Sequence, residues 1–109
     1  PRDLHSFPTR RSSDLLGFHA RPSTFISLIA RYHEGELHLI IDEEKFNAKS
    51  VMSLLQAGGI LADKGYQKVI MEGSRQAISD VKILAQNNYC EEGEFPRQLS
   101  YLRPDQGND

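Results

Sequence analysis

Pro22 is the residue that most constrains how the first half of this chain can fold. It lacks a backbone N–H and has a fixed φ, so within regular structure it suits the first turn of a helix. Apolar residues follow it at helical spacing: Phe25, Ile26, Leu28, Ile29 and Tyr32. The pattern predicts a helix from about Ala20 to about Tyr32.

His19 and Arg21 flank the predicted start of this helix. Free backbone N–H groups and the positive end of the helix dipole favour an anion there. The guanidinium of Arg21 suits phosphate oxygens, and the imidazole of His19 is a nucleophile. Together these groups indicate a phosphoryl-accepting site. The alternative is a solvated His that stands beside a helix start by chance, and these residues alone do not decide between the two.

Length, charge and cysteine content exclude several classes of protein. A chain of 109 residues suits one small domain. No apolar run approaches the length of a membrane span, and a net charge of −2 with mixed signs gives no reason to expect a nucleic-acid partner. The single Cys90 cannot form an internal disulfide, which agrees with a reducing compartment. No Cys/His cluster has zinc spacing and no phosphate-binding glycine loop is present, so we expect neither a metal nor a cofactor.

We expect residues 1–15 to be a non-native leader. Pro8 and the pairs Arg10-Arg11 and Ser12-Ser13 interrupt any strand or helix pattern. Residues 5–15 also match one reading frame of a common sequencing-library adapter, so the native sequence before Leu16 is expected to be missing. The alternative is a disordered basic leader.

The middle of the chain predicts alternating strands and helices. Residues 37–41 form a strand, a charged turn follows, and Phe46 resumes a short strand. Ser50 is a natural N-cap for a second, short helix, which Gly58-Gly59 should end. Residues 68–72 form another strand, and Ser74 caps a third helix.

From residue 91 onward, Gly, Pro, Gln, Asn and acidic residues dominate, so we expect a mostly disordered tail over residues 91–109. A few apolar residues are exceptions that could dock back onto the domain: Phe95, Leu99, Tyr101 and Leu102. The short links between the predicted strands favour an antiparallel sheet with helices on one face.

Two motifs together resemble the histidine-containing phosphocarrier protein (HPr) family of the bacterial sugar phosphotransferase system. They are Gly17-Phe18-His19-Ala20-Arg21-Pro22 and Asn47-Ala48-Lys49-Ser50-Val51-Met52, and the resemblance covers residues 16–90. It implies an α+β fold, the open-faced β-sandwich, in which three helices cover one face of a four-stranded antiparallel sheet. The first strand is poorly supported in this chain. The segment between Ser50 and Gly65 is also about three residues longer than the family pattern.

The resemblance implies a cytoplasmic, monomeric phosphocarrier that is not itself an enzyme and needs no cofactor. His19 would accept a phosphoryl group on Nδ1 from enzyme I and pass it to a IIA component, with Arg21 steadying the phosphoryl oxygens. Ser50 matches the serine that a dedicated HPr kinase phosphorylates in many bacteria; the alternative is an unmodified N-cap.

The resemblance also implies a partner-docking surface formed by Thr24, Val51, Met52 and Leu55. The alternative for these side chains, above all for Leu55, is core packing. Two other functions remain open for the whole chain. One is a regulatory paralogue that acts in a nitrogen branch or through Ser50 as a corepressor, and the other is a small interaction module in which His19 is incidental.

Overall fold

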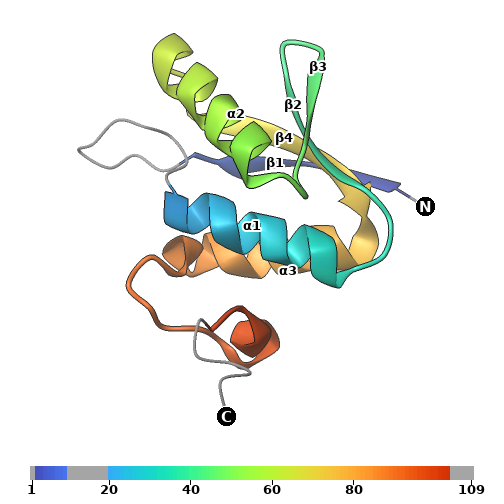
Figure 1. Ribbon diagram of the computed structural model, residues 1–109, viewed down its shortest axis with the longest axis vertical. Coiled ribbons are helices and arrows are strands. Elements are labelled where there is room, and N and C mark those ends of the chain that lie inside the picture. Colours follow the sequence, from blue (N-terminus) through green and yellow to red (C-terminus); the bar gives the residue numbers. More distant parts are fainter. Residues whose placement is uncertain (1, 10–19, 104–109) are drawn as a thin grey trace.

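The computed structural model describes residues 2–9 and 20–103, and it forms a four-stranded sheet with three α-helices (Figure 1). In chain order the elements are β1 (Arg2–Pro8), α1 (Ala20–Tyr32), β2 (Leu37–Ile41), β3 (Glu44–Asn47), α2 (Val51–Lys64), β4 (Lys68–Ser74) and α3 (Arg75–Gln86). Two short 3-10 turns follow, η1 (Asn88–Cys90) and η2 (Arg97–Leu102).

All strand pairs in the sheet are antiparallel, and the strand order is β1-β4-β2-β3. Side chains alternate between the two faces of each strand, as the pleat of a β-strand requires. On β2 the buried residues are Leu37, Leu39 and Ile41, and on β4 they include Val69 and Met71. These side chains form one core with the apolar faces of the helices. The predicted α+β open-faced sandwich is therefore confirmed.

The first strand, which the sequence supports poorly, is present in the structure as residues 2–8. β1 pairs with β4 from Arg2 opposite Ser74 to Pro8 opposite Lys68. This pairing uses backbone groups, and Pro is tolerated at the end of an edge strand. Phe7 points into the core and is 3% exposed, while Leu4 on the opposite face is 61% exposed. The origin of residues 1–15 as a non-native leader stays a prediction.

Helix α2 is longer than expected, because Gly58-Gly59 does not end it. The buried face continues past the glycines, from Leu54 through Ala57 and Gly58 to Leu61. The helix ends at Gly65, which has φ 69 and ψ 24. There the Tyr66 N–H donates to the Leu61 carbonyl at 3.0 Å, as in a Schellman motif. Left-handed φ at Gly65, and not the mere presence of glycine, terminates the helix.

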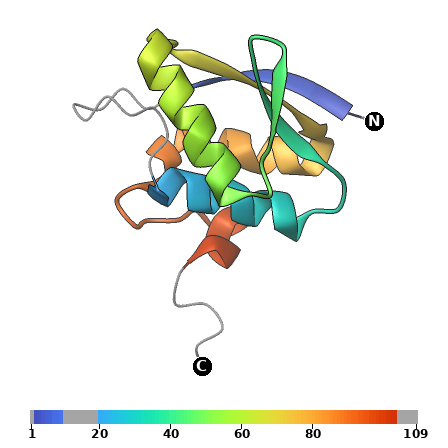
Figure 2. The same cartoon turned by 45° about the horizontal axis from the view of Figure 1, so that its top comes forward.

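The expectation of a disordered tail is wrong for residues 91–103, which we call the C-terminal strap. Leu99 and Leu102 of the strap are almost fully buried in the core. Figures 1 and 2 show the strap on the side of α1 and α3 that faces away from the sheet. The strap is a third layer, held by apolar side chains that are widely spaced in a polar sequence.

Candidate functional site

The first turn of α1 is the part of the predicted phosphoryl site that the structure describes. His19 lies outside the described residues. Helix α1 begins at Ala20, as predicted, and Pro22 is buried in its first turn. Because the first N–H groups of a helix have no partner within it, Pro22 removes a donor that the helix does not use.

Arg21 is exposed, and its guanidinium reaches the C-terminal strap. Its Nη1 donates a short hydrogen bond to the backbone carbonyl of Glu91. One turn further on, the ring of Phe25 packs edge-on against Phe95, with 5.2 Å between ring centroids. The strap therefore lies beside the first two turns of α1. Sequence reasoning did not predict this contact, because Glu91 takes part through its carbonyl and not through its side chain.

Ser27 links α1 to the second motif. Its side chain is fully buried, and its hydroxyl donates to the carbonyl of Lys49 at 3.0 Å. The bond joins the middle of α1 to the turn that precedes α2. The only sequence signal for Ser27 is a polar residue on the apolar face of a predicted helix, a position where a buried hydroxyl needs a hydrogen-bond partner.

Ser50 is the N-cap of α2, as predicted. Its backbone is extended, with φ −104 and ψ 115, and its Oγ accepts a hydrogen bond of 3.1 Å from the N–H of Ser53. The turn before it is closed by Asn47, whose Oδ1 accepts from the N–H of Lys49 at 2.9 Å. The Ser50 side chain is half-buried. The capping role is therefore observed, and phosphorylation of Ser50 stays a prediction.

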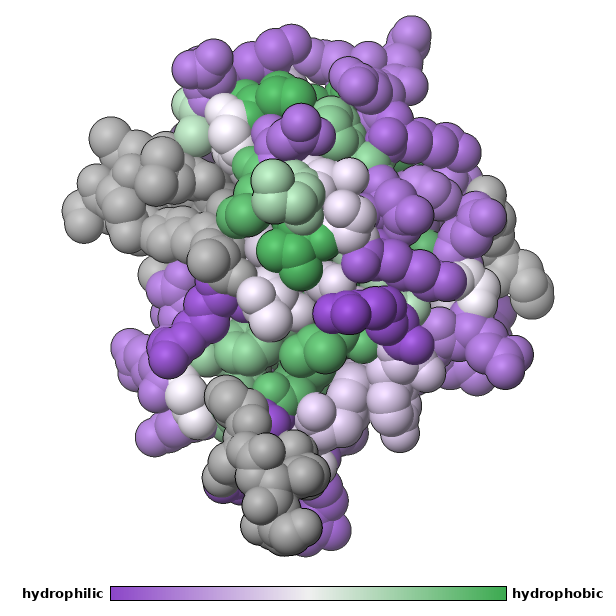
Figure 3. All heavy atoms as spheres, viewed as in Figure 1, coloured by the Kyte–Doolittle hydropathy of each residue, from purple (hydrophilic) through white to green (hydrophobic). Residues whose placement is uncertain are grey.

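The four side chains predicted to dock partners lie on adjacent helices, α1 and α2. Thr24 is exposed, Met52 is 70% exposed, and Val51 and Leu55 are half-buried. The core residue of this turn is the neighbouring Leu54, which is fully buried. Figure 3 shows apolar side chains gathered over α2 in the middle of one face.

The described residues contain no group of three or more His, Cys, Asp or Glu side chains that could hold a metal ion.

Cys90 is buried, and its burial raises the pKa of the thiol. Within residues 2–9 and 20–103, no helix is long and apolar enough to cross a membrane.

No protein-family model matches the chain, and no curated protein matches it either. Its fold is similar to that of the crystal structure of HPr-C-His from Thermoanaerobacter tengcongensis. The TM-score is 0.65 at 21% sequence identity, and the match covers 82% of this chain and 97% of that chain. The chain therefore has the fold of HPr, as its two motifs predicted.

Proposed function

We propose that this protein is a phosphocarrier that receives a phosphoryl group on His19. The chain has the fold of HPr, and its helix α1 begins at Ala20, directly after His19 in the sequence; this position supports the proposal. The motif of residues 17–22 thus spans the beginning of that helix. The donor would be enzyme I and the acceptor a IIA component of a sugar phosphotransferase system, both in the bacterial cytoplasm.

The proposed chemistry is a transfer onto imidazole nitrogen. The lone pair of neutral Nδ1 attacks phosphorus, an N–P bond forms, and the bond from phosphorus to the donor breaks. Imidazole is largely neutral near pH 7, so the nucleophile is available without a separate base. When the phosphoryl group leaves again, the ring nitrogen recovers its lone pair. The protein ends each cycle unchanged, and it acts as a carrier and not as an enzyme with its own turnover.

Arg21 is proposed to stabilise the transferring phosphoryl oxygens. A guanidinium has five N–H donors, so the bond from Nη1 to the Glu91 carbonyl leaves several for an anion. The hydrogen bond to the strap already restricts the rotamers of Arg21, so less side-chain entropy is lost when Arg21 binds phosphate. A carrier also has to release its cargo, so one cation with helix N–H groups suits the task better than a tight phosphate cage.

Docking of enzyme I and IIA is proposed at Thr24, Val51, Met52 and Leu55. The exposed Met52 suits a surface that meets more than one partner, because its unbranched side chain repacks easily. The half-buried Val51 and Leu55 offer apolar area at the base of this surface.

A second candidate function is regulation through Ser50. The half-buried hydroxyl stands at the N-terminus of α2, where a phosphate is electrostatically favoured. Phosphorylation by an HPr kinase would place a charge of roughly −2 beside Val51 and Met52, at the edge of the proposed docking surface, and slow transfer through His19. A regulatory paralogue of HPr would use this site and not require transfer through His19.

The proposal is tested by intact mass after the protein is mixed with phosphoenolpyruvate and enzyme I. We expect one phosphate to be gained, to be lost in mild acid, and to be absent from His19→Ala. Ser50→Ala is the matched control, and it should still gain the phosphate. If the wild-type protein, and also a version with a native first strand in place of residues 1–15, gains none, the carrier proposal is wrong.

A further inference from the structure

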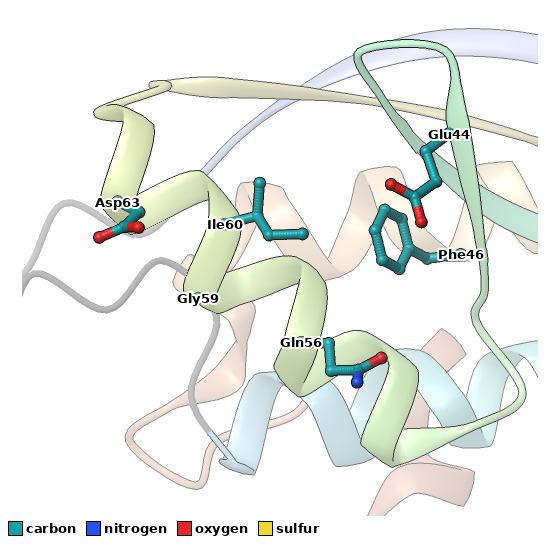
Figure 4. A pocket seen from close by; sticks show the side chains of 6 residues that line it. All are labelled: Glu44, Phe46, Gln56, Gly59, Ile60 and Asp63. Atoms are coloured by element: carbon teal, nitrogen blue, oxygen red, sulfur yellow. The ribbon is translucent and has the colours of Figure 1, made fainter.

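A groove of about 420 Å³ lies between α2 and β3, away from the start of α1 (Figure 4). Its lining residues are Glu44, Phe46, Gln56, Gly59, Ile60 and Asp63. The Phe46 ring and the Ile60 side chain face each other across it, and the Glu44 carboxylate lies beside the ring. The volume falls in the range of small-ligand sites, and the lining combines apolar walls with a few polar groups.

The groove is negatively charged and lacks a cation of its own among the described residues. Glu44 and Asp63 contribute two carboxylates, and Gln56 contributes an amide. The two neighbouring lysines are engaged elsewhere: Lys45 pairs with Glu72 at 3.1 Å, and Lys64 pairs with Asp42. The hydrogen bond between Lys64 and Asp42 raises the pKa of the lysine and lowers that of the carboxyl. Both lysines are therefore held as partners of other carboxylates.

The groove is continuous with the proposed docking surface. Gln56, Gly59 and Asp63 follow Met52 at spacings of four, seven and eleven residues, which places them along one face of α2. A protein that covers Met52 would therefore also reach the groove. Gly59 has no side chain to obstruct the middle of this helix face, and even an added Cβ would meet nothing within 4 Å.

We propose that the groove binds an arginine side chain of a partner protein that docks on α2. The methylene stem would pack on Ile60 and on the small exposed part of Phe46, which is 7% exposed, and the guanidinium would pair with Glu44. Asp63 also lines the groove, and its carboxylate, which points away from Phe46 in Figure 4, adds negative potential around it. This inference rests on the proposed function only in its choice of α2 as the docking helix.

The probe for this site is N-acetyl-arginine amide, and the matched probe without charge is N-acetyl-citrulline amide. The full chain is titrated with each while backbone amide shifts are followed by NMR. We expect saturable shifts at Phe46, Gln56, Gly59 and Ile60 with the arginine probe, with an affinity on the order of millimolar for so small a ligand. The citrulline probe should give much smaller shifts. Equal shifts with both probes, or shifts spread over the whole surface, would overturn the proposal.

Glu44→Gln and Glu43→Gln form a matched pair of variants. Both remove one exposed carboxylate from the same hairpin, but only Glu44 lines the groove. Glu44→Gln should weaken binding of the arginine probe roughly threefold to fivefold, as for a partly exposed ion pair, and Glu43→Gln should leave it unchanged. Equal weakening in both variants would mean that only the net charge matters, which contradicts a specific site. The titration needs no phosphoryl donor, so its outcome is independent of whether His19 is phosphorylated.

Discussion

The hydroxyl of Tyr101 donates a hydrogen bond of 2.5 Å to Oδ2 of Asp80, and so joins the C-terminal strap to α3. The same carboxylate oxygen lies 2.8 Å from Nε2 of His33, the residue that follows α1. The ring of Tyr101 also stacks on Tyr32, with 4.0 Å between centroids. Tyr101 therefore joins the strap to the end of α1 and to the middle of α3, and the strap belongs to the folded domain.

Replacing Tyr101 with Phe tests this role of the strap. The stacked ring is kept and the hydrogen bond to a carboxylate is lost, so we expect the free energy of unfolding to fall by about 2 kcal/mol at neutral pH. Urea unfolding measures the change. Tyr32→Phe is the control. Because Tyr32 is largely exposed, this substitution should lower the free energy of unfolding much less. Equal effects of the two variants would contradict the assigned role of the Tyr101 hydroxyl.

The Tyr101 hydroxyl also predicts a pH dependence. Burial, and then the hydrogen bond to Asp80, raise the pKa of Tyr101 above its ordinary value. A raised pKa in the folded state means that the stabilisation is complete below the unfolded value, about 10, and is lost as pH rises above it. The stability difference between the wild type and Tyr101→Phe should therefore shrink between pH 9 and pH 11, at roughly the pH where an unfolded tyrosine ionises. A constant difference over this range would contradict the prediction.

Gly59 and Gly65 give opposite predictions for the same substitution. Gly59 lies inside α2 with open space around it, so Gly59→Ala should stabilise the protein by about 0.5–1 kcal/mol through helix propensity. Gly65 has φ +69, so Gly65→Ala should destabilise it by about 1 kcal/mol. Thermal unfolding of both variants measures the two changes in stability. Destabilisation by Gly59→Ala would show that the helix does not continue through residue 59.

Elements with a strong local pattern could be predicted from the sequence. Pro22 and the apolar stripe after it fixed the start and the end of α1 correctly. Ser50 and Ser74 both cap helices through their hydroxyls, because a serine before an apolar periodic segment satisfies free N–H groups locally. The position of Arg21 in the first turn followed from the same pattern.

Elements that depend on distant contacts could not be predicted. β1 needs the edge of β4, which no local pattern reveals. Leu99 and Leu102 stand out in the sequence as apolar residues able to dock back, but their burial depends on the outer surface of α1 and α3, which lies far away in sequence. The same holds for the hairpin turn, where Asp42 and Glu43 take positive φ values of 51 and 73 without a glycine. The hydroxyl of Tyr66 donates to Asp42 at 3.0 Å, and Lys64 pairs with it. Both partners are more than twenty residues away in sequence.

The register of β1 predicts a contrast between its two faces. Phe7 points into the core, so Phe7→Ala should lower the free energy of unfolding by about 3 kcal/mol. Leu4 points away from the helices, so Leu4→Ala should change it by no more than about 0.5 kcal/mol. Chemical denaturation of both variants measures the contrast. Similar small effects from both would mean that residues 2–8 do not pair with β4 in solution.

Two substitutions at Ser50 should change stability and the rate of phosphoryl transfer independently of each other. Ser50→Ala removes the acceptor for the Ser53 N–H and should cost about 1 kcal/mol of stability, with no change in the rate of phosphoryl transfer to a IIA protein. Ser50→Asp keeps an N-cap acceptor and adds a negative charge beside Val51 and Met52. It should fold as stably as the wild type and transfer more slowly, as phosphorylated Ser50 would. Transfer at the wild-type rate by Ser50→Asp would leave this serine with a capping role alone, because a charge at the edge of the docking surface would then have no effect on the partner.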